Sequence, residues 1–193
     1  GINNSFSLSY VDYYNDINLA SIRYGRDFDK IGSFVATIDY HNYGDFYYAN
    51  ENGTIEDKTF SVSDYGINIG WGRKLNDKFS IGANLKFAGI QYENNSSFAV
   101  AVDVAGTYIT KNNWVLSLVA RNIGSELYNN YQGFRNKLPF KLQAGFSKKL
   151  EHLPLTFIMV YDNIQKWNLG YDDPLDLENN YDPMTGQMQE KSK

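Results

Sequence analysis

Cysteine is absent from the 193 residues of this sequence, which excludes disulfide bonds and thiolate-bound metal sites. Proline is scarce, with four residues, and no apolar run reaches the roughly 18 residues of a membrane-spanning helix. The formal net charge of −4 gives no basic footprint for nucleic acid. These absences do not exclude a membrane protein that crosses the bilayer with β-strands, because such a strand needs only about 10 residues and alternate ones are polar.

Aromatic residues, by contrast, are abundant: 16 Tyr and 12 Phe contribute to an aromatic share of 16%. They accompany a regular alternation of polar and apolar residues. In the segment 64–73, Tyr65, Ile67, Ile69 and Trp71 fall on one face, and Asp, Asn and Gly residues fall on the other. Period-2 alternation over this length predicts a long β-strand, and abundant aromatics suit both strands and the aromatic girdles of membrane barrels.

The same alternation predicts about nine strands along the chain. They cover residues 5–11, 17–26, 32–43, 60–74, 78–92, 98–110, 114–123, 139–149 and 155–164. From residue 17 onward most are roughly 10–15 residues long, which is enough to cross a bilayer at a tilt. The segment 171–193 is polar, lacks periodicity and is predicted to be an extracellular loop or tail.

Short and long connections alternate between these predicted strands. The short ones are 26–31, 75–77, 111–113 and 150–154; between them lie 44–59, 93–97, 124–138 and the stretch after 165, most of which are longer. Tight turns at one end and long loops at the other are typical of an outer-membrane barrel, with the turns in the periplasm and the loops outside the cell. The fold prediction is therefore an all-β, antiparallel transmembrane outer-membrane β-barrel.

An odd strand count and a polar end indicate an incomplete barrel, because unpaired edges in lipid leave backbone groups unsatisfied. We therefore predict that residues 1–170 belong to a barrel whose C-terminal strands are missing from this sequence. The alternative is a soluble up-and-down barrel with its apolar face inside, as in lipocalins, with room for one small ligand.

The two predicted faces differ in chemistry. Every second residue of the segments 34–40, 65–71, 79–87, 98–104, 114–120, 140–146 and 155–161 is apolar or aromatic, and none is charged, as a lipid-facing surface requires. The opposite face collects Arg23, Asp39, His41, Asp64, Asn68, Asn84, Lys86, Asp103, Arg121, Lys141, Gln143 and Asp162. Mixed signs favour a lumen filled by paired side chains over a charge-selective pore, although a watery pore stays open.

No catalytic residue, cofactor or metal site is predicted. His41 and His152 are the only histidines and lie far apart in the sequence, which argues against a catalytic triad or a zinc site. Acidic residues in the stretch Asp172–Asp182 could bind calcium through carboxylate oxygens, but their spacing is not that of an EF-hand. A solvated acidic loop is the favoured interpretation.

Several sequence strings resemble a known family in order and spacing. They are NNSFSLSY at 3–10, GWGRKL at 70–75, IGANLKF at 81–87, VARNIG at 119–124, KKLEH at 148–152 and QKWNLGYDDP at 165–174. Together they resemble the PorQ-like outer-membrane proteins of the type IX secretion system, which are related to the FadL fatty-acid transporters. The resemblance implies a fourteen-stranded barrel that extends beyond both ends of this sequence.

The resemblance also implies a noncatalytic role in the attachment complex, with PorZ, PorU and PorV as partners. There the sortase PorU links secreted cargo to anionic lipopolysaccharide, and a PorQ-like barrel anchors PorZ. Adaptable Tyr- and Asn-rich loops suit such recognition. The predicted contact residues are Tyr43, Asp45, Phe46, Tyr47, Tyr48, Tyr128, Tyr131 and Phe134. Two alternatives stay open: a FadL-type transporter of hydrophobic small molecules and a PorV-like cargo shuttle.

Overall fold

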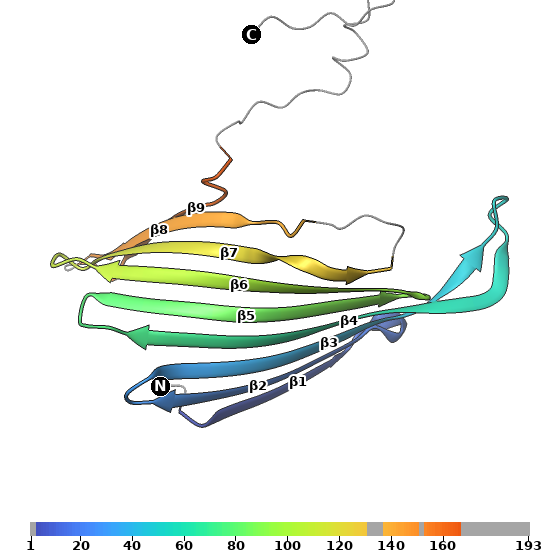
Figure 1. Cartoon of the computed structure of the whole chain (residues 1–193), viewed down its shortest axis with the longest axis horizontal. Helices are drawn as coiled ribbons and strands as arrows, with labels where there is room; N and C mark the ends of the chain where they lie inside the picture. Colours follow the sequence, from blue (N-terminus) through green and yellow to red (C-terminus); the bar gives the residue numbers. More distant parts are fainter. Residues whose placement is uncertain (1–2, 131–136, 151–152, 167–193) are drawn as a thin grey trace, which may run out of the picture.

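The computed structural model describes residues 3–130, 137–150 and 153–166 (Figure 1). These residues form one antiparallel sheet of nine strands in which sequence neighbours pair throughout. The all-β, antiparallel fold predicted from the sequence is confirmed. The elements are β1 (Ser5–Asp12), the 3-10 helix η1 (Tyr14–Asp16), β2 (Asn18–Phe28), β3 (Gly32–Ala49), β4 (Ile55–Lys74), β5 (Phe79–Tyr92), β6 (Asn95–Ile109), β7 (Trp114–Asn129), β8 (Lys141–Lys149) and β9 (Thr156–Tyr161).

The connections gather at two ends of the sheet (Figure 1). We call the end that holds the β2–β3, β4–β5, β6–β7 and β8–β9 connections the turn end. The opposite end, which holds η1 and the β3–β4 connection, is the hairpin end. The β3–β4 hairpin projects beyond its neighbours there and bends away from the sheet. Among the described residues no helix is long and apolar enough to cross a membrane.

The strand register places the predicted apolar positions on one continuous side of the sheet. Directly opposed residues of antiparallel strands point to the same side. Ile38 opposes Ile22 on β2 and Ile67 on β4, and Leu85 opposes Ile69 and Val102. The same parity continues through β7, β8 and β9. We call this side the apolar face and the other the polar face; for the residues within the strands, the sequence assigned these faces correctly.

Nothing in the described chain covers either face. Ala101, 7% exposed, is the one buried hydrophobic residue among the described residues, whereas Ile38 on the apolar face is 51% exposed. A single sheet without a second layer has no hydrophobic core of the usual kind. Backbone pairing and cross-strand side-chain contacts therefore hold these residues together. The apolar face requires a cover from outside the described chain.

The predicted loops at the hairpin end are largely strand, so the loop boundaries drawn from the sequence were wrong. In the predicted loop 44–59, β3 continues to Ala49 and β4 begins at Ile55. A β-bulge shifts the register between Asn42 and Asp45, and pairing then resumes. Gly44 adopts a φ of +79° at this bulge, a conformation that glycine tolerates without strain.

The other two predicted loops are shortened in the same way. β7 extends to Asn129, well into the predicted loop 124–138, and only Glu93 and Asn94 join β5 to β6. Strict alternation of short and long connections is therefore wrong as a count of loop residues. What distinguishes the hairpin end is the reach of the β3–β4 strands. The segment 171–193, with its candidate calcium stretch, lies outside the described residues.

Candidate functional site

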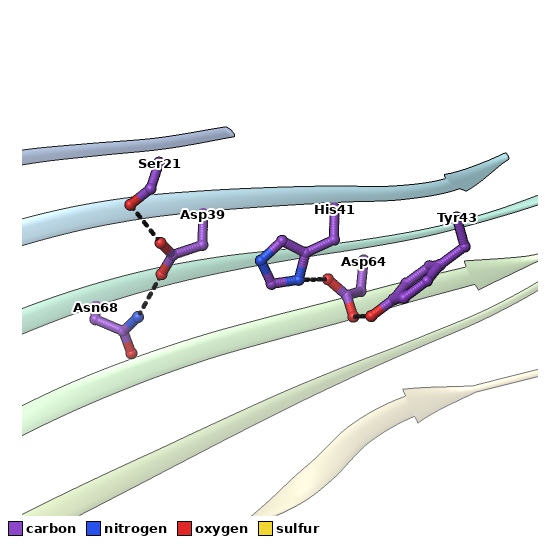
Figure 2. Close-up of polar contacts among 6 residues, drawn as sticks. All are labelled: Ser21, Asp39, His41, Tyr43, Asp64 and Asn68. Atoms are coloured by element: carbon purple, nitrogen blue, oxygen red, sulfur yellow. Dashed lines mark hydrogen bonds and ion pairs between the residues drawn. The ribbon is translucent and has the colours of Figure 1, made fainter. Parts of the chain in front are cut away.

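On the polar face, two aspartates connect three neighbouring strands (Figure 2). Asp39 accepts hydrogen bonds from Ser21 Oγ at 2.7 Å and from Asn68 Nδ2 at 3.4 Å. Asp64 Oδ1 lies 2.7 Å from His41 Nδ1, and its Oδ2 accepts a hydrogen bond from the Tyr43 hydroxyl at 2.8 Å.

Asp64 thus links His41 to Tyr43, and among the described residues the His41 ring has no hydrogen bond to a serine hydroxyl, the contact that a catalytic triad requires. We interpret the arrangement as a structural contact that links the neighbouring strands β3 and β4. Within the described ranges, no group of three His, Cys, Asp or Glu side chains is placed to hold a metal ion.

A second polar network lies at the β-bulge between β6 and β7. Lys86 Nζ lies 2.6 Å from Asp103 Oδ2 and donates to Asn122 Oδ1 at 3.1 Å. Asp103 Oδ1 accepts from the Asn122 backbone N–H at 2.9 Å, and Asn122 has a φ of +58°. The register shifts between Val102 and Val104 at this point. The network supplies partners for backbone groups that the interrupted ladder leaves unpaired.

Only some of the charged side chains on the polar face have ion-pair partners. Within the part of the chain that the structure describes, Arg23, Arg121 and Lys141 form no ion pair. Arg23 and Arg121 line a hollow of about 480 Å³ whose other walls come from β3 to β6. The predicted filling of this face by paired side chains therefore holds for Asp39, Asp64 and Lys86 with their partners, but two arginines face open space.

The hairpin carries a cluster of aromatic rings on the side that continues the polar face. The Phe60 ring stacks on Phe46 with centroids 5.5 Å apart, and contacts Tyr48 at 5.0 Å and Tyr92 at 5.1 Å. Lys58 lies over the Tyr48 ring at 4.5 Å. We call Phe46, Tyr48, Phe60 and Tyr92 the hairpin cluster. Cross-strand aromatic contacts of this kind stabilise a hairpin that has no neighbour layer.

The structure separates the predicted contact residues. Phe46 and Tyr48 belong to the hairpin cluster, whereas Tyr47 alternates to the other side of β3 and is 64% exposed. Tyr43 is tied to Asp64 on the polar face, and Asp45 is exposed where pairing resumes after the bulge.

Tyr128 opposes Phe98 on the apolar face, away from the hairpin cluster. Tyr131 and Phe134 lie outside the described residues. The sequence did not point to the cluster residue Phe60, to Tyr92, or to their neighbours Lys58 and Glu93. Alternation along β4, counted back from Asp64 on the polar face, would have placed Phe60 and Lys58 on that same side.

The Tyr48 hydroxyl donates a hydrogen bond to the Glu93 carboxylate, which raises the pKa of Tyr48 to about 12. Because this folded-state pKa lies above the ordinary value of 10.0, the stabilisation that the Tyr48–Glu93 hydrogen bond gives is present below pH 10 and is lost as pH rises toward 12.

A difference absorbance titration of the wild type minus Tyr48→Phe should show one phenol with a midpoint near 12. In Glu93→Gln the midpoint should fall toward 10; a wild-type midpoint already near 10 would contradict the contact.

The apolar face has polar borders at both ends. Asn42, Ser63 and Gln91 oppose one another at the hairpin end. At the turn end, Arg73 opposes Ile81, and Lys148 opposes Trp114. On β4, Ser63 and Arg73 are ten positions apart, or about 33 Å at the usual rise per residue.

At the tilt of a barrel strand, this length corresponds to an apolar band of about 25 Å, the height found on outer-membrane barrels. The residues of this face between the two borders of β4 are Tyr65, Ile67, Ile69 and Trp71.

No protein-family model, curated protein or solved structure matches this chain. Three features of the structure bear on function: the uncovered apolar face with its polar borders, the partly paired polar face, and the projecting hairpin with its aromatic cluster.

Proposed function

We propose that this chain is part of a noncatalytic outer-membrane β-barrel that anchors a partner protein at the cell surface. The observation that carries the proposal is the uncovered apolar face, which runs across nine strands between two polar borders. Leaving such a surface in water is unfavourable by about 25 cal/mol for each Å². A lipid bilayer covers it without requiring a second protein layer, and strands with one polar side suit a barrel wall.

In this proposal the polar face lines the lumen, and the remaining strands of the barrel pair with the edges at β1 and β9. The resemblance to PorQ-like proteins supplies the expected total of fourteen strands. The turn end lies at the periplasmic surface and the hairpin end outside the cell, because barrels of this class carry their longest extensions on the extracellular side and the β3–β4 strands reach furthest at the hairpin end. The β3–β4 hairpin then projects furthest from the membrane toward a surface partner.

The resemblance also names the partner: PorZ, held near the sortase PorU and the shuttle PorV where cargo is joined to lipopolysaccharide. The hairpin supports this role through its exposed side. Tyr47 presents a large amphipathic ring to solvent, and the hairpin cluster behind it fixes the strand that carries it. Rigid, exposed tyrosine is a common anchor in protein recognition.

A transporter of hydrophobic molecules is the weaker candidate. Its binding site would require an apolar lumen, but the hollow lined by Arg23, Lys86 and Arg121 is polar. The apolar hollow of the described residues, which contains Ile81, Gly106 and Leu118, lies on the opposite side of the sheet.

The replacement Tyr47→Ala should release PorZ from the cell surface. Tyr47 lies on the side of β3 opposite the hairpin cluster, so the hairpin should stay folded while partner binding weakens by about tenfold or more, as for an aromatic interface anchor. The measurement is the surface-retained fraction of PorZ in cells that carry the full-length variant as their only copy. Tyr14→Ala is the matched control, because Tyr14 is 89% exposed at the same end but lies in η1. Unchanged retention in Tyr47→Ala, with normal amounts of protein in the outer membrane, would contradict the assigned role of the hairpin.

A further inference from the structure

We propose that the apolar face binds an anionic phospholipid at its turn end, with an acyl chain in a hollow across β5 to β9 and the phosphate at a basic border. This inference rests on the proposed function, since it assumes that the apolar face meets lipid. It adds a defined lipid site and a headgroup preference to a surface that would otherwise be a uniform band.

The hollow has a volume of about 630 Å³, within the roughly 300–1,000 Å³ of small-molecule sites. Its floor includes the small residues Gly106 and Ala144, and larger side chains such as Phe79, Leu118 and Met159 form its walls. An added Cβ at Gly106 would meet no atom within 4 Å, so the space above this residue is open. A hollow with almost entirely apolar walls on a lipid-facing surface suits a hydrocarbon chain.

Basic residues surround the hollow at its turn end. Arg73 opposes the wall residue Ile81, and Lys148 follows the wall residue Phe146 by two positions on β8. Lys148 lies over the Trp114 ring at 5.0 Å, a contact that holds its ammonium group at the border of the apolar face.

The turns between these strands add Lys78, next to the wall residue Phe79, and Lys111. The acidic residue in the described part of these turns, Asp77, is paired with Lys74 at 3.3 Å. The border therefore keeps an excess of positive charge.

The opposite border of the same face differs in charge. It is formed by Asn42, Ser63 and Gln91, and Asp12 opposes Asn18 at the same end of β1 and β2. Neutral and acidic side chains give no attraction for a phosphate group there. Charge complementarity thus selects an anionic phospholipid headgroup, and it selects the turn end for it.

The test uses the full-length protein in vesicles that contain brominated phosphatidylglycerol or brominated phosphatidylcholine. Bromine quenches tryptophan fluorescence on contact, and Trp114 reports on the site when every other tryptophan of the full-length protein, Trp71 and Trp167 included, is replaced by Phe. We expect quenching at lower mole fractions of phosphatidylglycerol, by about fivefold for each basic residue that meets the phosphate. The double variant Arg73→Gln/Lys148→Gln should lose most of this preference. Arg23→Gln removes a charge from the polar face and should keep it.

Gly106→Leu provides an independent test, because the new side chain enters open space and fills the hollow. It should reduce the preferential quenching by phosphatidylglycerol while the protein remains inserted. Equal quenching by the two lipids in the wild type, or an unchanged preference in Gly106→Leu, would overturn the lipid site. Removal of the wild-type protein from vesicles by alkaline carbonate would instead refute membrane insertion, so failure of the proposed function is recognised separately.

Discussion

Replacing Ile69 with lysine is expected to destabilise the protein in a bilayer. Ile69 lies in the middle of the apolar face, opposed by Ala36 and Leu85. A lysine on the lipid-facing side of a barrel costs about 2–4 kcal/mol at the bilayer midplane. The measurement is the free energy of unfolding of the full-length protein in lipid vesicles, from urea titration monitored by tryptophan fluorescence.

The neighbouring replacement Asn68→Lys is the matched control. It adds the same charge one residue away, but on the polar face, where Asp39 lies within hydrogen-bonding distance of the present amide. We expect a change within about 0.5 kcal/mol, because the new ammonium group meets water and a carboxylate. If Asn68→Lys were the damaging replacement and Ile69→Lys the harmless one, the polar face would be the covered side and the proposed orientation of the sheet would be wrong.

Gly124→Ala should strongly destabilise the protein, by more than Gly106→Ala on the paired strand. A Cβ at Gly124 would lie 2.0 Å from the Val100 carbonyl oxygen and 2.6 Å from Ala101 Cα. Both are backbone atoms of the paired strand β6, so relief requires that β6 and β7 separate beside their bulge. Overpacking of this kind costs about 1–3 kcal/mol, and more when backbone must move. Urea unfolding in vesicles measures the loss.

Gly106→Ala controls for the general effect of adding a methyl group to a glycine in a strand. Gly106 lies on β6, the strand that pairs with β7 at Gly124, but its added Cβ meets no atom within 4 Å. The expected change in unfolding free energy is within about 0.5 kcal/mol. Equal effects of the two replacements would show that β6 and β7 are not packed as closely at Gly124 as the structure has them.

The strands and their two faces could be predicted from the sequence because both depend on a two-residue alternation of polar and apolar side chains. Alternation at positions such as Ile67 and Ile69 is local, and one face must be consistently apolar if it is to be covered. The paired partners of Asp64 and Asp103 could not be predicted, because they come from neighbouring strands whose register depends on bulges. The bulge between Asn42 and Asp45 leaves no clear trace in the hydrophobic pattern, and Gly44 alone does not specify it.

The length of the β3–β4 hairpin could not be predicted from the sequence because of its amino-acid composition. Asp, Asn, Glu and Gly dominate the region between Gly44 and Thr59, and this composition favours loops. The strands form there because Phe46 and Phe60 stack across the pair after the register shifts. The sequence therefore predicts that the contact residues lie together in adaptable loops. The structure divides them between the interior of the hairpin cluster, represented by Tyr48, and its exposed side, represented by Tyr47.

The most direct test of the central claim is a spin-label scan along β4 of the full-length protein in lipid vesicles. This sequence contains no cysteine, so each position can be replaced singly by a labelled cysteine in a full-length protein whose remaining segments also lack cysteine. We expect labels at 65, 67, 69 and 71 to be relaxed by membrane-dissolved oxygen, and labels at 64, 66, 68 and 70 to be shielded from it. A period of two in oxygen accessibility, in phase with the apolar face, would support a transmembrane barrel wall. Uniform accessibility, or the opposite phase, would contradict it.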